Sequence, residues 1–214
     1  MALKRLLGRV VPVLFLASSV LAQVNELSVT AGRTFVSTQT VLNTGLSFNP
    51  TLHFGNEETV AFNYSRLLKT VGIFGFRPEL PVAIYPNMDL NTAYHGVPKD
   101  IGALFVTPSL RVNFFSGDSL TPWVSAGGGY GRFRYASGLN FYGSNQGPGG
   151  GNTGVVQFGA GLDAWIWEHW GARLEARDFY SGEPDLNGIA GKTINTNRTR
   201  MHNYYVGVGI AYRF

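Results

Sequence analysis

The stretch that decides the fold is the last one of the chain, residues 201–214, which reads MHNYYVGVGIAYRF. Its residues alternate between an apolar face and a face of small or polar side chains, and the alternation runs to the terminal Phe214. A period of two residues predicts a β-strand with one apolar face. A soluble domain rarely places such a face at a free terminus, because it favours aggregation, whereas the same face is stable against lipid. We therefore predict that this strand lies in a membrane.

The first residues of the chain have the pattern of a secretory signal. Three basic residues precede a short apolar run over residues 10–20, and Ala22 is a small residue after which a signal peptidase cuts. The run is too short to cross a bilayer as a helix. We predict a signal peptide over residues 1–22 and one domain over residues 23–214.

Composition favours a membrane β-barrel over a soluble domain. Aromatic residues make up 14% of the chain, there are 28 glycines, and charged residues reach only 14%. A typical soluble domain has about 25% charged residues. The mature chain has no apolar run long enough for a transmembrane helix, which needs about 20 residues. Transmembrane β-strands alternate in polarity and fit this composition.

Charge and cysteine content exclude several function classes. Of the 17 Lys and Arg residues, three lie in the predicted signal, so the mature chain carries 14 against 13 Asp and Glu. This near neutrality gives no support to nucleic-acid binding. The chain has no cysteine and therefore no disulfide or thiolate metal site. Its histidines have no metal-ligand spacing, and we predict neither a metal nor a cofactor.

Alternation along the whole chain predicts eight strands of sufficient length to cross a membrane at a tilt. We place them at residues 26–36, 59–68, 71–85, 101–115, 121–135, 154–167, 170–181 and 201–214.

The predicted connections alternate between short and long. Short turns are expected at residues 69–70, 116–119 and 168–169, and long segments at residues 37–58, 86–100, 136–153 and 182–200. Outer-membrane barrels have short periplasmic turns and longer extracellular loops. The pattern therefore predicts both termini on the periplasmic side.

Apolar and charged side chains separate onto opposite faces of these strands. An Arg or Lys that faces the middle of the lipid costs about 2–4 kcal/mol, so we assign the charged face to the barrel interior. The residues predicted to face lipid include Val60, Phe62, Leu110, Phe158 and Leu174. The charged residues predicted to face the interior are Arg77, Glu79, Arg111, Asp163, Arg173, Glu175, Arg177 and Arg213.

Two features depart from a plain alternation, and a third concerns the rim of the barrel. Five charged residues fall on the apolar face, near strand ends where the cost approaches zero. These are Arg33, Arg66, Arg132, Arg134 and Asp178. The three glycines at residues 127–129 are a candidate bulge that would shift the phase of their strand. Several aromatic residues are expected to form a girdle at the periplasmic rim, namely Trp165, Trp167, Trp170, Tyr212 and Phe214.

The signal peptide, the eight amphipathic strands and the closing sequence VGIAYRF resemble the small eight-stranded outer-membrane β-barrel family of Gram-negative bacteria. The resemblance covers nearly all of residues 26–214 and implies a location in the outer membrane. It also implies a signal for the barrel-assembly machinery at Val208, Ile210, Tyr212 and Phe214. Such barrels include anchors, adhesion proteins, narrow pores and lipid-modifying enzymes, so the resemblance implies no single activity.

The interior charges allow two interpretations. An eight-stranded barrel is just wide enough for side chains to fill its interior. The five interior cations and three anions are therefore expected to form a salt-bridge network that plugs the lumen. The alternative is a narrow, arginine-lined pore for small solutes.

An enzymatic function is a second alternative. The lipid A deacylases of the family carry a His followed two residues later by Ser and then Asn, with a carboxylate that orients the His. Residues 202–205 read His-Asn-Tyr-Tyr at a comparable place and contain no Ser. We therefore predict no catalytic residue, and that the protein is not an enzyme.

We predict an all-β protein, an eight-stranded antiparallel transmembrane β-barrel with a filled polar lumen and a structural or surface-binding role. The expected partners are outer-membrane lipids, lipopolysaccharide and the barrel-assembly machinery, and the protein is expected to be a monomer. A periplasmic lipocalin-like barrel is a further alternative. It would have the opposite arrangement, with apolar residues inside and polar residues outside.

Overall fold

The computed structural model describes residues 25–42, 51–91, 100–135, 149–182, 195–196 and 200–214. The predicted signal peptide and large parts of the four predicted long loops lie outside these residues. Every element of the described part is a β-strand. Among these residues no helix has the length and apolar character to cross a membrane.

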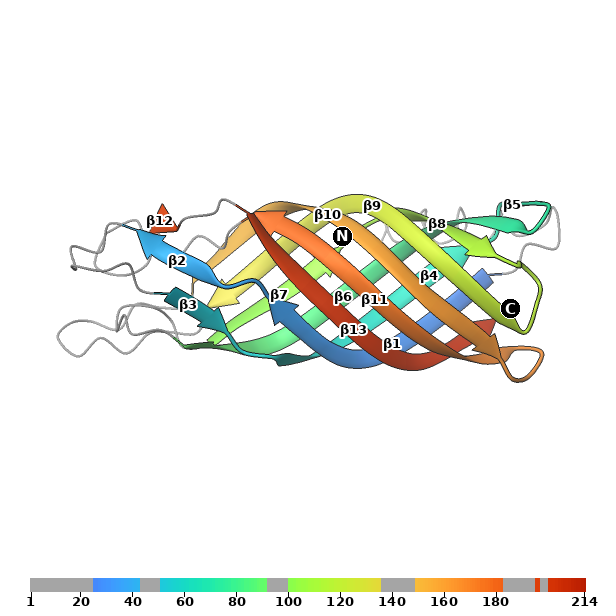
Figure 1. Cartoon of the computed structure of the whole chain (residues 1–214), viewed down its shortest axis with the longest axis horizontal. Coiled ribbons are helices and arrows are strands. Elements are labelled where there is room, and N and C mark those ends of the chain that lie inside the picture. Colours follow the sequence, from blue (N-terminus) through green and yellow to red (C-terminus); the bar gives the residue numbers. More distant parts are fainter. Residues whose placement is uncertain (1–24, 43–50, 92–99, 136–148, 183–194, 197–199) are drawn as a thin grey trace, which may run out of the picture.

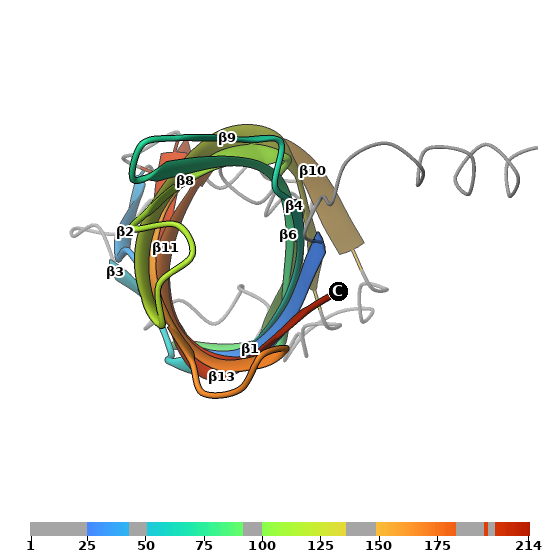
Figure 2. The same cartoon turned by 90° about the vertical axis from the view of Figure 1, so that its right-hand side faces the viewer.

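Eight antiparallel strands form a closed barrel wall, as predicted (Figures 1 and 2). The wall consists of β1 (Asn25–Val36), β4 (Glu57–Arg66), β6 (Phe74–Asn91), β7 (Asp100–Val106) with β8 (Ser109–Phe114), β9 (Leu120–Tyr135), β10 (Gly149–Trp165), β11 (Trp170–Gly182) and β13 (Arg200–Arg213). The barrel closes because β1 pairs with β4 on one side and with β13 on the other. The first and last wall strands are therefore neighbours.

One predicted strand, residues 101–115, is interrupted and forms both β7 and β8. Pro108 lies at the interruption, and proline has no N–H to donate to a strand ladder. The main chain still bridges the gap. Thr107 N donates to Pro81 O (3.1 Å), and Gly128 N donates to Pro108 O (3.1 Å). Because β7 and β8 each pair with β6 and with β9, they act together as one wall strand.

The turns gather at one end of the barrel, together with the C-terminus (Figure 1). The turn predicted at residues 69–70 is wrong, because β5 (Lys69–Val71) pairs there with the start of β6. The chain reverses instead at Gly72, whose φ of 59° suits glycine. The other two turns lie close to their predicted places, between β8 and β9 and between β10 and β11. We call this end the turn end and the opposite one the loop end.

Short strands at the loop end occupy parts of the segments that were predicted as loops. β2 (Gln39–Leu42), β3 (Thr51–Phe54) and β12 (Asn195–Thr196) pair there, and β3 also pairs with the far end of β6. A register shift lies between β6 and β7, at Tyr85 and Met88. The predicted bulge at residues 127–129 is wrong, since the β9–β10 register is continuous through the three glycines.

The predicted division between outer and inner faces is correct. Phe62, Leu110, Phe158 and Leu174 point outwards, with exposed fractions of 47%, 51%, 57% and 52%. The phase of β9 does not change, and its Trp123 and Phe133 are both buried inside. The outside is therefore apolar and the inside holds the charges, which is the reverse of a lipocalin-like barrel.

The closing seam between β1 and β13 requires glycine at two inward positions. A Cβ atom at Gly209 would clash with the carbonyl oxygen of Val29, and one at Gly32 would clash with that of Val206. Both obstacles are main-chain atoms of the partner strand, so no side-chain rotation relieves them. Close approach of the two main chains thus depends on these glycines.

We expect Gly209→Ala to destabilise the folded barrel by about 1–3 kcal/mol, which is the usual cost of overpacking. Urea unfolding in detergent micelles, followed by the heat-modifiable shift on gels, measures the change. Gly154→Ala in β10 is the matched control, because no atom lies within 4 Å of its added Cβ. Equal stability of the two variants would contradict the close approach at the seam.

Candidate functional site

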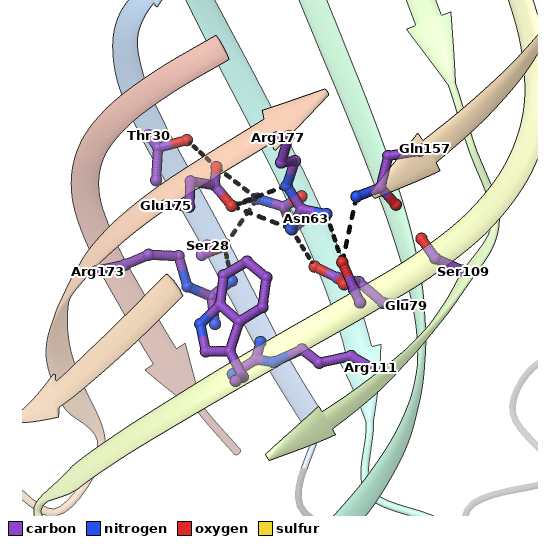
Figure 3. Close-up of polar contacts among 12 residues, drawn as sticks. Ser28, Thr30, Asn63, Glu79, Ser109, Arg111, Gln157, Arg173, Glu175 and Arg177 are labelled. Atoms are coloured by element: carbon purple, nitrogen blue, oxygen red, sulfur yellow. Dashed lines mark hydrogen bonds and ion pairs between the residues drawn. The ribbon is translucent and has the colours of Figure 1, made fainter. Parts of the chain in front are cut away.

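The lumen at the turn end holds a cluster of charged side chains from several wall strands (Figure 3). The structure brings seven of the eight predicted interior charges together, and all seven are buried. These are Arg77, Glu79, Arg111, Asp163, Arg173, Glu175 and Arg177. The eighth, Arg213, is the cross-strand partner of Glu26, but it is only partly buried and forms no ion pair with a described residue. Strand alternation places them, because each occupies an inward position of its strand.

The cluster has one part centred on two carboxylates, Glu26 and Asp163. Arg111 donates to both, through Nη1 to Glu26 Oε1 (2.7 Å) and through Nη2 to Asp163 Oδ2. Arg173 also donates to both, and its Nε reaches Asp163 Oδ1 at 2.7 Å. Arg77 Nη1 lies 3.6 Å from Glu26 Oε2. Each of these two carboxylates thus accepts hydrogen bonds from more than one guanidinium group, which offsets the cost of burying its charge.

The second part is centred on Arg177. Its Nη2 donates to Glu79 Oε1 (2.5 Å), and the same nitrogen lies 3.0 Å from Glu175 Oε2. Glu175 Oε1 also accepts from Thr30 Oγ1 (2.5 Å) and from Asn63 Nδ2 (3.3 Å). These contacts join side chains from β1, β4, β6 and β11 across the lumen.

Ser28 connects the two parts. Its hydroxyl oxygen accepts from Arg173 Nη1 (2.6 Å) and from Asn63 Nδ2 (3.2 Å). We call the whole set the lumen network. It contains four arginines and four carboxylates, so its formal charges balance. Its members are Glu26, Arg77, Glu79, Arg111, Asp163, Arg173, Glu175 and Arg177.

Trp123 lies in the middle of the lumen network. Its ring centroid is 4.7 Å from the guanidinium carbon of Arg111, 5.4 Å from that of Arg173 and 5.0 Å from that of Arg177. Its Nε1 donates to Asp163 Oδ1 (3.3 Å). The indole fills the space between like charges and offers them its negative face.

Two members of this site were missed by the sequence interpretation, Glu26 and Trp123. Glu26 begins the first predicted strand, and it shares the inward parity of Ser28 and Thr30 opposite the apolar Leu27 and Val29. This alternation contained the signal for Glu26. Trp123 has the inward parity as well, but an apolar residue among charges gives no signal in the sequence.

The half of the lumen at the loop end has an apolar core beside uncharged polar residues such as Thr34 and Asn203, so the prediction of a polar lumen holds there only in part. The buried core there comprises Ala61, Ala83, Tyr85, Ile101, Ala103, Phe105, Phe133, Val155, Phe179, Met201 and Tyr205. Phe105 stacks on Phe179 with centroids 5.0 Å apart, and its edge contacts with Tyr85 and Phe133 are both at 5.8 Å. Aromatic rings fill the width of a small barrel as well as charged side chains do.

The C-terminal strand places its predicted assembly residues on the outer face. Val208, Ile210 and Phe214 are exposed, and Tyr212 is half-buried next to Trp170, with ring centroids 4.7 Å apart. The main chain of Phe214 exchanges two hydrogen bonds with Asn25 (2.9 and 3.0 Å). The terminal residue is therefore part of the closing seam.

One residue of the predicted aromatic girdle lies elsewhere. Trp165 has the inward parity of Asp163, and the guanidinium of Arg213 stacks on its ring at 3.3 Å. This pair lies at the turn-end mouth of the lumen. Trp165 therefore lies at the predicted rim but faces the lumen instead of joining an outer girdle, whereas Trp167 and Trp170 are exposed as expected.

The histidine motif at residues 202–205 contributes to both faces of β13. His202 points outwards and its Nδ1 lies 2.7 Å from Asp178 Oδ2. Asn203 points inwards, where its Nδ2 donates to Phe179 O (2.7 Å). Within the described ranges, no group of three or more His, Cys, Asp or Glu side chains is arranged to hold a metal ion.

We expect Arg173→Met to destabilise the barrel by about 3–5 kcal/mol, because it leaves Glu26 and Asp163 buried with too few partners. Arg213→Met is the matched control. Arg213 forms no ion pair with a described residue, so losing its contact with Trp165 should cost about 1 kcal/mol. Urea unfolding of the refolded proteins measures both. A similar loss of unfolding free energy in the two variants would contradict the claim that the ion pairs of the network stabilise the barrel.

Comparison with known proteins supports the architecture. No protein-family model matches the sequence, and no curated protein sequence matches it. Among solved structures, the chain is similar to the outer membrane protein OprG from Pseudomonas aeruginosa, with a TM-score of 0.64 and 14% identity over 90% of this chain and 96% of that one. Neisserial surface protein A gives a TM-score of 0.52 with 10% identity over 89% and 97%.

The outer membrane protein AlkL, determined by solid-state NMR in DMPC lipid bilayers, gives a TM-score of 0.51 with 15% identity over 89% of this chain and 90% of that one. These neighbours are outer-membrane proteins of Gram-negative bacteria, as the predicted location requires. At this level of identity the likeness concerns the fold. The chain has the fold of the small eight-stranded outer-membrane β-barrels.

Proposed function

We propose that the protein is a non-conducting outer-membrane barrel that acts as a rigid scaffold for a binding surface at its loop end. The observation that supports this proposal is the lumen network. Arg111, Asp163 and Gln157 have no exposed surface, and Glu26 and Glu175 are 1% exposed. A conducting lumen needs hydrated polar groups, whereas the charged groups here are buried and form ion pairs with one another.

The energetics also favour a closed lumen. Taking one partner out of a buried ion pair costs about 3–5 kcal/mol, so separating several pairs to admit a solute is strongly unfavourable. The network is also crossed by the large ring of Trp123. The rings of Phe105, Phe133 and Phe179 occupy the other half of the lumen. The narrow pore is therefore the weaker alternative.

A binding role draws support from the loop end. Here β2, β3 and β12 add short paired strands beyond the wall, and β6 extends to Asn91 to pair with β3. Rigid strands that continue past the barrel are suited to holding loops in place for recognition. We propose outer-membrane lipids and lipopolysaccharide as the surroundings of this end.

We also propose that the protein is a monomer without catalytic activity and without a nucleic-acid partner. The Ser37 hydroxyl accepts from the His202 main-chain nitrogen (3.2 Å), while the His202 imidazole is hydrogen-bonded to Asp178. That arrangement does not activate a serine nucleophile. The outward apolar positions of the C-terminal strand support recognition by the barrel-assembly machinery.

Planar-bilayer recording of the refolded protein tests the closed lumen. We expect no discrete conductance steps above the baseline over a range of applied voltages. Heat-modifiable migration on gels should show beforehand that the sample is folded. Reproducible steps from folded protein, lost when the protein is heat-denatured before addition, would establish the pore instead.

A further inference from the structure

The outer face of the barrel carries a hydrogen-bonded Asp–His pair that the proposed scaffold role does not need. Asp178 of β11 and His202 of β13 point outwards, with His202 Nδ1 2.7 Å from Asp178 Oδ2. Their side chains are 21% and 38% exposed. A carboxylate on the lipid-facing parity is unusual, because it is stable only near the interface or with a partner. A local departure from the general pattern often marks a functional site.

Planar groups surround this Asp–His pair. The His202 ring lies 4.7 Å from the ring of Tyr180 and stacks on that of Tyr204 at 5.3 Å, with an angle of 5° between the planes. The guanidinium carbon of Arg200 lies 5.5 Å from the Tyr180 centroid. A cation, an imidazole, a carboxylate and two phenol rings thus share one outward patch. We call these five residues the outer patch.

The outer patch borders directly on the lipid-facing surface. Asp178 is paired across strands with Phe158 on one side and with Tyr204 on the other. Tyr204 is in turn paired with Phe35 of β1. Phe35 and Phe158 are exposed by 41% and 57%. An amphiphile whose head group contacts the patch can therefore keep its acyl chains on the adjacent apolar side chains.

The patch also has unused hydrogen-bonding capacity. Asp178 Oδ1 is enclosed and has no hydrogen-bond partner among the described residues. When the Nδ1–H of His202 donates to Asp178, its Nε2 is left for another group. Because Asp178 Oδ1 is enclosed, the group open to a ligand hydroxyl is the imidazole of His202, whose side chain is 38% exposed.

We propose that the outer patch binds the phosphorylated sugar head group of an outer-leaflet glycolipid, with lipopolysaccharide as its physiological form. Tyr180 and Tyr204 provide faces for a sugar ring, and His202, oriented by Asp178, provides a hydrogen bond for one of the sugar hydroxyl groups. Arg200 provides the cation for a phosphate. This inference rests on the proposed surface-binding role, and it specifies the ligand.

Binding of labelled rough-type lipopolysaccharide to the full refolded protein in mixed micelles tests the proposal. We expect His202→Ala and Asp178→Asn to weaken binding by roughly tenfold or more, which corresponds to the loss of one hydrogen bond to a charged group. Asn152→Ala is the matched control, since it removes another outward polar contact, that with the Tyr130 hydroxyl (2.6 Å). It should bind like the unmodified protein.

Competitors identify which part of the lipid is recognised. Unlabelled lipopolysaccharide should displace the label, whereas phosphatidylglycerol and inorganic phosphate should not do so at comparable concentrations. Equal competition by phosphatidylglycerol would overturn the proposal, because binding would then need only acyl chains and a phosphate. Unchanged binding by both patch variants, or equal weakening by Asn152→Ala, would overturn it too.

A second measurement needs no variant. Carbethoxylation of His202 by diethylpyrocarbonate, located by mass spectrometry, should slow severalfold when lipopolysaccharide is added. His169, exposed at the turn end, is the internal control and should react at an unchanged rate. An unchanged His202 rate would refute the site. A barrel that remains non-conducting but fails this test loses only the glycolipid inference, whereas conductance would refute the scaffold proposal itself.

Discussion

The ion pairs of the lumen network are the interaction on which the rest of the structure depends. Arginines from β6, β8 and β11 meet carboxylates from β1, β6, β10 and β11, so most of the wall contributes to one buried cluster. A register slip of one residue on any of these strands would turn its charges towards lipid, at about 2–4 kcal/mol for each arginine near the midplane. The same slip would leave its partners inside without counter-charges. The network therefore specifies the register as well as filling the barrel.

The sequence predicted the architecture well because a membrane barrel obeys a strict rule of alternation. The period of two residues identified all eight wall strands and placed Arg111, Asp163 and Arg173 inside, where they are. It did not reveal which interior charges pair, since pairing depends on barrel closure and strand stagger. Glu26 was overlooked although its parity was visible in the sequence. The apolar core of the loop-end half was not predicted. In β7 both faces carry apolar residues, so the sequence does not show which of them, such as Phe105, point inwards.

Loops and turns were harder to predict for a physical reason. At the barrel wall the lipid imposes the alternation of side chains. Beyond the wall, main-chain pairing between strands determines which residues form strands. The strands β2, β3 and β5 are short, and a few main-chain hydrogen bonds hold them rather than a long amphipathic pattern. Asp178 was recognised as an exception on the apolar face, but only the structure places it beside His202. Asp178 and His202 are diagonal neighbours on adjacent strands. Their proximity therefore depends on the strand register and cannot be read from either strand alone.

The most direct test of the account is the accessibility of the lumen network to a water-borne reagent. The chain has no cysteine, so Ser125→Cys introduces a single thiol beside Arg177 and Gln157. A cationic methanethiosulfonate reagent should modify this thiol far more slowly than a control thiol at the exposed Glu168, and rapidly only after the barrel is unfolded. Modification of both folded variants at the same rate would mean that the lumen is open to water, and the account of a closed barrel would be wrong.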